Sequence, residues 1–251
     1  MKKIIFSLLA LGIFTFQAGA QFNLNKLEKQ GQDAVNKVEG KKGDSTSALS
    51  NEDVVKGLKE ALKVGTNNSG DAASKVDGFY KNPKIFIPFP PDAQKMKDRV
   101  IEMGMKDQVD KFEMNLNRAA EEAAKKAAPV FVNAITSMTV SDGFSILKGA
   151  NNAATQYLKD KTSADLITQF RPIVDEAINK VELTKSWTPI VTTYNKIPFV
   201  EKQNPDLGDY VTKKAIDGLF LLIADEELKI RKDPAAQVTD ILKKVFGSVM
   251  K

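Results

Sequence analysis

A group of polar side chains on one predicted helix is the first candidate for a binding site. Asn115, Arg118 and Glu122 are spaced three and four residues apart within a long amphipathic stretch, so they share one side of a helix. Arg118 and Glu122 have the i, i+4 spacing of an ion pair. Two interpretations remain open: the group either forms a salt-bridge lattice between helices or lines the site of a bound ligand.

Carboxylates on both sides of the most apolar run of the chain suggest a second chemistry. Asp217 precedes residues 218–224, and Glu226 and Glu227 follow them. A pair of carboxylates can act as general acid and general base, whereas a carboxylate taken into a core needs a cation partner. The cations considered as partners of Asp217 are Lys213, Arg118 and Arg171. Structural pairing and acid–base catalysis are both consistent with these residues.

Two tyrosines complete the candidate set, because their hydroxyl groups can form hydrogen bonds inside a pocket. The predicted ligand-binding residues are Asn115, Arg118, Tyr157, Arg171, Tyr210, Asp217 and Glu226. No residue is assigned as catalytic.

The chain contains no cysteine and no histidine, which excludes several kinds of site. Disulfides, thiol catalysis, a Ser-His-Asp triad and a typical catalytic zinc site all need one of these residues. The sequence also contains no phosphate-loop, dinucleotide-binding or EF-hand motif. We therefore predict no cofactor and no metal site, and any metal would have to be held by oxygen ligands.

The net charge of +5 says little about partners, because lysines alternate with acidic residues along most of the chain. A nucleic-acid-binding protein usually concentrates its basic residues in a stripe. The distribution predicts a solvated surface of mixed charge and no nucleic-acid partner.

The first twenty residues have the layout of a secretory signal peptide. Lys2 and Lys3 are followed by the mostly apolar residues 4–16 and by a small-x-small site at residues 18–20. The apolar run is too short to span a membrane. We therefore expect residues 1–20 to be removed, leaving an exported protein of the periplasm or the cell surface, with no transmembrane span in the mature chain.

Residues 21–49 are expected to form an amphipathic arm and a flexible linker, ahead of a helical domain over residues 50–251. Apolar residues recur at helical spacing in residues 22–39, but the charges of this stretch cancel, unlike those of a helix that binds an anionic membrane. The Gly-, Ser- and Lys-rich stretch after it has the composition of a linker. Ser50 and Asp53 then form a capping box that opens the first helix of the domain.

Apolar periodicity predicts that nearly all of the domain is helical. The first helix is expected to end at Gly65, with a loop or break at residues 67–70. Capping boxes at Thr139 and Thr162 indicate two more helix starts, and Pro172 predicts a kink if its helix continues. Further helices are predicted over residues 92–103, 105–127, 208–231 and 234–246. Sustained strand patterns are absent, so we predict an all-α fold: one multi-helix, bundle-like domain with Pro-rich extended straps.

The first of these straps is residues 83–91, which contain four prolines among apolar residues. Proline fixes φ and removes a donor, so the segment is extended. It either lies across the helical core or forms the lip of a ligand groove. A second Ile-Pro-Phe sequence occurs at residues 197–199.

Several segments of the domain are distinctive as motifs: GLKEALKVGT (57–66), KIFIPFP (84–90), MNLNRAAEEAA (114–124), ATQYLKDKT (154–162), FRPIV (170–174) and DYVTKKAIDGLFLLIADEELKIRKDP (209–234). On these segments the chain resembles the DUF4197 family, a set of exported bacterial proteins of unknown function. The resemblance implies a helical domain and an envelope or extracellular location. It implies no particular activity, because the function of the family is unknown.

These observations favour a non-enzymatic binding or interaction protein of the cell envelope, whose partner is a hydrophobic small molecule, a lipid or an envelope protein. Helical bundles can hold such ligands between their helices. The alternative is a carboxylate-based hydrolase or lyase that acts on polysaccharide. A third hypothesis is a structural envelope component that self-associates through its arm.

Overall fold

The computed structural model describes residues 49–141 and 143–249. Within these residues the chain forms nine α-helices and two 3₁₀ turns and no strand, which confirms the predicted all-α fold. The helices are α2 (Asn51–Ala73), α3 (Gln94–Glu102), α4 (Lys106–Ala124), α5 (Ala127–Ser137), α6 (Gly143–Leu147), α7 (Ala153–Lys180), α8 (Leu183–Asn195), α9 (Leu207–Lys232) and α10 (Asp240–Phe246). The predicted signal peptide and nearly all of the predicted arm lie outside the described residues. None of the helices in the described ranges combines the length and the apolar character that a membrane crossing requires.

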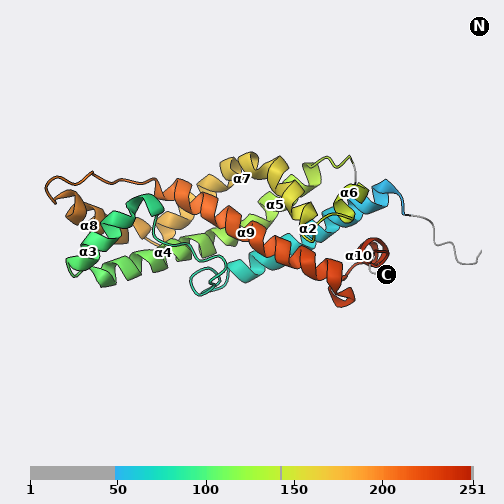
Figure 1. The fold of residues 1–251 in the computed structure, drawn as a ribbon, viewed down its shortest axis with the longest axis horizontal. Coiled ribbons are helices and arrows are strands. Elements are labelled where there is room, and N and C mark those ends of the chain that lie inside the picture. The colour runs from blue at the N-terminus through green and yellow to red at the C-terminus, as the bar shows by residue number, and fades with distance from the viewer. Residues whose placement is uncertain (1–48, 142, 250–251) are drawn as a thin grey trace, which may run out of the picture. The chain divides into compact units, whose positions relative to one another are not determined.

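The longest helices, α7 and α9, lie side by side, and most of the other helices pack against one or both of them (Figure 1). Helix α2 packs along one half of α9, while α4 contacts α7, α8 and α9. Helix α5 lies between α2 and α7. The shorter helices close the ends: α3 packs on α8, and α10 packs on α2.

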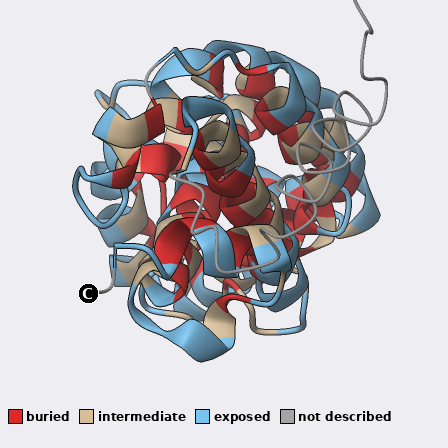
Figure 2. Ribbon diagram, turned by 90° about the vertical axis from the view of Figure 1, so that its right-hand side faces the viewer, coloured by how far each residue is buried: buried red, intermediate tan, exposed pale blue. Residues whose placement is uncertain are grey.

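Each helix turns its apolar face inward, so that buried residues gather between the helices (Figure 2). Phenylalanines from α4, α5, α7 and α10 are among the largest fully buried side chains. At the α3–α8 end, Phe112 of α4 and Trp187 of α8 lie with their ring centroids 4.7 Å apart, and Phe89 packs on both. Burial of such rings is the main source of stability in a protein without disulfides.

The predicted strap, residues 83–91, lies against helix α4. Residues 83–85 form a turn, residues 86–90 form no helix, and Pro91 begins a 3₁₀ turn (Pro91–Ala93), so the strap is extended only in part. Ile85, Ile87 and Phe89 are buried in the core, while the backbone of the strap is bound by polar side chains of α4. Asn117 donates to the carbonyl of Ile87 and accepts from its N–H, and both distances are 2.8 Å. Of the two interpretations given above, the structure therefore supports a strap across the core.

Two glutamates extend this contact along α4, four residues on either side of Asn117. Glu113 accepts from the backbone N–H of Phe89 at 3.1 Å. Glu121 accepts from the N–H groups of Phe79 and Tyr80, both at 3.1 Å. Since residues four apart share one side of a helix, a single row of side chains fixes the chain from residue 79 to residue 89.

Helix α2 begins at the predicted capping box but runs past its predicted end. Ser50 accepts from the N–H of Asp53, as expected. The helix then continues through Gly65 and residues 67–70 to Ala73, so the predicted break is wrong. Gly65 and Gly70 are buried, and a Cβ on Gly65 would lie 3.2 Å from the Cβ of Glu226 on α9. Close helix packing thus outweighs the low helix propensity of glycine.

Two other predicted helix boundaries also need correction. Thr162 does not cap a helix: it lies inside α7, and its hydroxyl donates to the carbonyl of Leu158 at 2.6 Å. Helix α7 also continues through Pro172. Asp233 caps only a short 3₁₀ turn, and the last helix begins later, with Thr239 as its cap. The predicted capping box at Thr139 involves residue 142, which lies outside the described residues.

Candidate functional site

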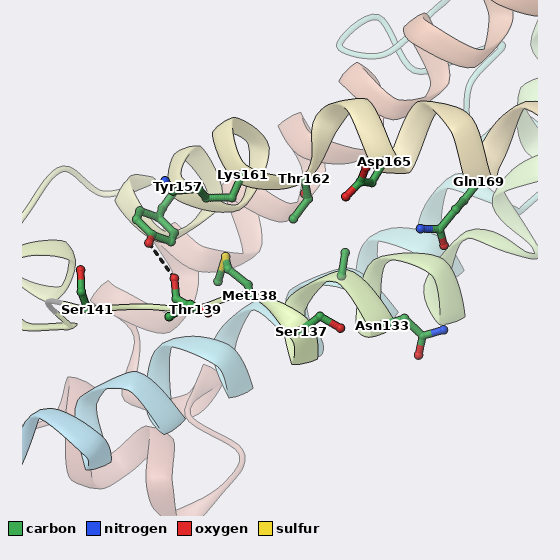
Figure 3. A pocket seen from close by; sticks show the side chains of 11 residues that line it. Asn133, Ser137, Met138, Thr139, Ser141, Tyr157, Lys161, Thr162, Asp165 and Gln169 are labelled. Carbon is green, nitrogen blue, oxygen red and sulfur yellow. Dashed lines mark hydrogen bonds between the residues drawn. The ribbon is translucent and has the colours of Figure 1, made fainter.

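An open cleft of about 540 Å³ lies between α5, the segment that follows it, and α7 (Figure 3). Its volume is in the range of small-molecule sites. We call it the α5–α7 cleft. Its lining residues are Asn133, Ala134, Ser137, Met138, Thr139, Ser141, Tyr157, Lys161, Thr162, Asp165 and Gln169.

The α7 wall of the cleft is a row of polar side chains with strict four-residue spacing. Tyr157, Lys161, Asp165 and Gln169 follow one another at i, i+4, i+8 and i+12. At 3.6 residues per turn, this spacing keeps all four on one side of the helix. The row therefore extends over about three turns of α7.

The opposite wall and the floor come from α5 and the residues after it. Asn133 and Ser137 repeat the four-residue spacing on α5. Met138 and Thr162 lie between the walls (Figure 3), and Ala134 also lines the cleft. The site therefore combines polar walls with two aliphatic residues.

Part of this lining is engaged in contacts within the protein. The Tyr157 hydroxyl donates to the carbonyl of Thr139 at 2.7 Å and so ties α7 to the segment after α5. The Lys161 ammonium lies 5.7 Å from the centroid of the Tyr157 ring, a cation–π distance. These contacts hold the phenol and the lysine at one end of the cleft.

Four other side chains of the cleft, those of Asn133, Ser137, Asp165 and Gln169, have no hydrogen bond or ion pair with any described residue. They offer two amides, a hydroxyl and a carboxylate, which together can donate and accept several hydrogen bonds. A ligand that bears hydroxyl, amine or amide groups could satisfy them. Among the residues described, no three acidic side chains gather closely enough to hold a metal ion.

Of the residues predicted from sequence, Tyr157 lies in this cleft, and the others lie elsewhere. Asn115 and Arg118 line a smaller hollow of about 220 Å³ beside residues 74–76. Arg118 bonds to Asp77 at 2.7 Å and to Glu121 at 2.6 Å, so the predicted Arg118–Glu122 pair is wrong. Arg118 thereby braces the turn that leads into the strap.

The remaining members of the predicted group are also held by structural contacts. Asn115 donates to the Ser186 hydroxyl of α8 at 3.3 Å. Glu122 pairs with Lys125 and Lys180, and these hydrogen bonds lower the pKa of its carboxyl. The salt-bridge interpretation therefore describes these residues better than a ligand site does.

The carboxylates around residues 218–224 do not form an acid–base pair. Asp217 is exposed and pairs with Lys159 at 2.8 Å, a partner that the sequence did not suggest. Glu226 bonds to Asn68 at 2.7 Å and pairs with Lys229.

Glu227 is buried with Arg231, and their ion-pair distance is 2.8 Å. Its carboxylate also accepts from the N–H groups of Ala154 and Thr155 at the start of α7. Arg231 donates to the carbonyl of Leu147 at the end of α6. The pair thus joins α6, α7 and α9, and these contacts occupy the hydrogen-bonding groups of both side chains.

Arg171 and Tyr210 position chain segments and do not meet in a pocket. Arg171 pairs with Asp175 and Asp206 at 3.0 Å and so holds the start of α9. Tyr210 donates its hydroxyl to the carbonyl of Pro88 in the strap at 3.0 Å. Burial raises the pKa of Tyr210 to about 12.

Sequence reasoning missed most of the α5–α7 cleft. The four-residue spacing on α7 was available as a signal, but an exposed helix face commonly carries such rows. Only the packing of α5 against α7 shows that the two rows face each other.

Comparison with known proteins gives one family. The sequence model of DUF4197, described as a protein of unknown function, matches residues 48–247. Searches of the curated proteins and of the solved structures found no match.

Proposed function

We propose that this chain, which belongs to the DUF4197 family, is a non-enzymatic binding protein of the cell envelope that holds a small polar molecule in the α5–α7 cleft. The observation that carries the proposal is the group formed by Asn133, Ser137, Asp165 and Gln169, whose side chains have no partner among the described residues. Elsewhere on α7, polar side chains four residues apart bond to each other, as Gln156 does to Asp160 and Arg171 to Asp175. Here they face a hollow of about 540 Å³.

The polar walls favour a hydrophilic ligand over the hydrophobic molecule or lipid considered first. Hydrophobic ligands are held by predominantly apolar pockets with few polar groups. In the α5–α7 cleft, Ala134 and Met138 are the aliphatic residues of the lining, and most of the others carry polar groups. Asp165 and Lys161 add one charge of each sign, which suits a neutral or zwitterionic molecule.

The polysaccharide hydrolase or lyase is the less favoured function. Such enzymes commonly use two carboxyl groups roughly 5–10 Å apart in a cleft. Asp217, Glu226 and Glu227 are each engaged with a separate cation. Among the described residues that line the α5–α7 cleft, Asp165 is the one carboxylate. The proposed location in the periplasm or at the cell surface is supported by the signal-peptide pattern of residues 1–20.

The test is native mass spectrometry of the mature protein, purified without detergent from an envelope fraction. Ser137→Trp fills the cleft with an indole ring, while Thr136→Trp places the same ring at the neighbouring exposed position outside the lining. We expect a bound species on the wild type and on Thr136→Trp that is lost on denaturation, and none on Ser137→Trp. Circular dichroism checks that both variants are folded. Apo protein in every sample, or a species that persists on Ser137→Trp, contradicts the proposal.

A further inference from the structure

The loop between α8 and α9 can be followed in Figure 1. It carries an aromatic residue whose side chain is exposed to solvent. Phe199 has a relative exposure of 107%, the highest of the exposed large apolar residues. Its neighbour Pro198 is also exposed. A single exposed apolar residue is common on protein surfaces. Phe199 differs from such a residue in its backbone conformation and in the charges of the residues around it.

The backbone at Phe199 is strained in the conformation that presents the ring. Its φ is 62°, in the left-handed region, where a bulky L-residue is a genuine outlier. Such strain persists only where the surrounding structure imposes it, and it clusters at functional sites. A glycine or asparagine would adopt this conformation more easily, so the aromatic ring has a different reason to be there.

The surroundings that impose this conformation are at the base of the loop. The side-chain amide of Asn195, the last residue of α8, donates to the carbonyl of Gln203 at 3.1 Å and accepts from its N–H at 2.9 Å. The two bonds bring the ends of residues 196–202 together. The apex is therefore preorganised, which reduces the ordering cost of any contact that it makes.

Two cations flank the apex. Lys196 precedes it and Lys202 follows it, both exposed, and neither forms an ion pair with a described residue. Many lysines on the helices are paired with acids. Glu201 is the one acid between the two lysines, so residues 196–202 carry a net positive charge.

We propose that this loop is a membrane-contact site that inserts Pro198 and Phe199 into the interfacial region of a bilayer containing anionic phospholipids, with Lys196 and Lys202 at the level of the phosphates. Aromatic and aliphatic side chains enter this region, and each nearby lysine adds attraction to an anionic surface. A protein pocket would have to enclose the ring, whereas a convex apex with a cation on each side fits a flat anionic surface. With a single inserted aromatic, the contact is weak and reversible.

The proposal is tested by sedimentation of the full mature protein with phosphatidylglycerol-containing vesicles and with pure phosphatidylcholine vesicles. The variants are Phe199→Ser, Lys196→Gln/Lys202→Gln and a matched control, Val238→Ser, which removes another exposed apolar side chain away from the loop. We expect Phe199→Ser to lower the partition coefficient on anionic vesicles about tenfold. The double lysine variant should lower it at least about fivefold, and Val238→Ser should leave it unchanged.

A second measurement reports how deeply the loop enters the bilayer. In Phe199→Trp, the new indole should show a blue-shifted emission and quenching by brominated lipid, after subtraction of the signal from the buried Trp187 of the wild type. The proposal is overturned if the wild-type protein does not bind anionic vesicles, or if Phe199→Ser binds them as well as the wild type does. So does a Phe199-dependent crosslink to an envelope protein in place of lipid, which would assign the loop to a protein partner. These outcomes do not depend on the α5–α7 cleft.

Discussion

Two of the three hydrogen bonds of the Asn117 side-chain amide go to the backbone of a single residue, Ile87, and the third goes to the carbonyl of Glu113 on its own helix. The donor and acceptor distances are each 2.8 Å, and both residues are buried. In a sheet, a neighbouring strand would satisfy the two backbone groups of Ile87. Here a helix side chain replaces the strand, and it does so at the centre of the strap.

Asn117→Asp should destabilise the protein by about 3 kcal/mol or more, because the variant loses the donor to Ile87 and places a carboxylate against its carbonyl. Urea unfolding measures the change, and hydrogen exchange should show that the Ile87 amide loses protection first. The matched control is Asn115→Asp, on the same helix but part-buried and with one bond to Ser186. We expect the control to change stability by less than about 1 kcal/mol. Equal effects would contradict the assigned role.

Glu227→Gln should destabilise by about 3–5 kcal/mol, since it leaves the buried guanidinium of Arg231 without its counter-charge. Glu52→Gln removes one partner of an exposed i, i+4 pair with Lys56 and should change stability by less than about 0.5 kcal/mol. Chemical denaturation at neutral pH compares the two. A mild effect of Glu227→Gln would show that the Glu227–Arg231 pair does not hold α6, α7 and α9 together.

Two buried hydroxyl groups of α2, those of Thr66 and Ser69, have no hydrogen-bond partner among residues 49–141 and 143–249. Because a buried unsatisfied polar group opposes folding, Thr66→Val and Ser69→Ala should each raise the free energy of unfolding by about 1 kcal/mol. Both changes keep nearly the same volume. Thermal and urea unfolding test the prediction, and a loss of stability would indicate that the hydroxyls are bonded in solution.

Stability should fall at alkaline pH through Tyr210. Its pKa is raised from 10.0 to about 12 by burial, so the folded state favours the protonated phenol. A raised pKa contributes stability that is present below pH 10 and is lost as the pH rises to about 12. Tyr210→Phe should remove this component, and the difference in tyrosinate absorbance between wild type and variant should titrate near pH 12. A difference that titrates near pH 10 would contradict the burial of the phenol.

We predict that two side chains of the α5–α7 cleft can be replaced without a change in stability. Asn133→Ala/Gln169→Ala should change the free energy of unfolding by less than about 0.5 kcal/mol, because neither side chain has a partner among the described residues. The same variant should lose the bound species seen by native mass spectrometry. A large loss of stability would show that these residues are structural.

Helices and the strap could be predicted from the sequence better than the contacts between distant side chains could. The capping box at Ser50, the proline-rich strap and the long helix after residue 207 depend on local chemistry, so local patterns found them. The end of α2 was misjudged because Gly65 and Gly70 are used for close packing against distant helices, which local propensity does not record. The partners of Arg118 and Asp217 were missed for the same reason: Asp77 and Lys159 are brought near by the fold.

The candidate site depended even more on tertiary structure. Tyr157 was found by residue type alone, while Asn133, Asp165 and Gln169 look like ordinary exposed helix residues in the sequence. What distinguishes them is that they face a hollow without partners, and the sequence of α7 alone does not contain that information.

The strap also affects how the molecule behaves at high concentration. Extended segments can recruit a second chain when they expose a row of free N–H and C=O groups. In residues 83–91 the four prolines lack backbone N–H donors, both backbone groups of Ile87 are bonded to Asn117, and the N–H of Phe89 donates to Glu113. The strap therefore offers little backbone on which cross-β stacking could start, although its apolar composition would otherwise favour such aggregation.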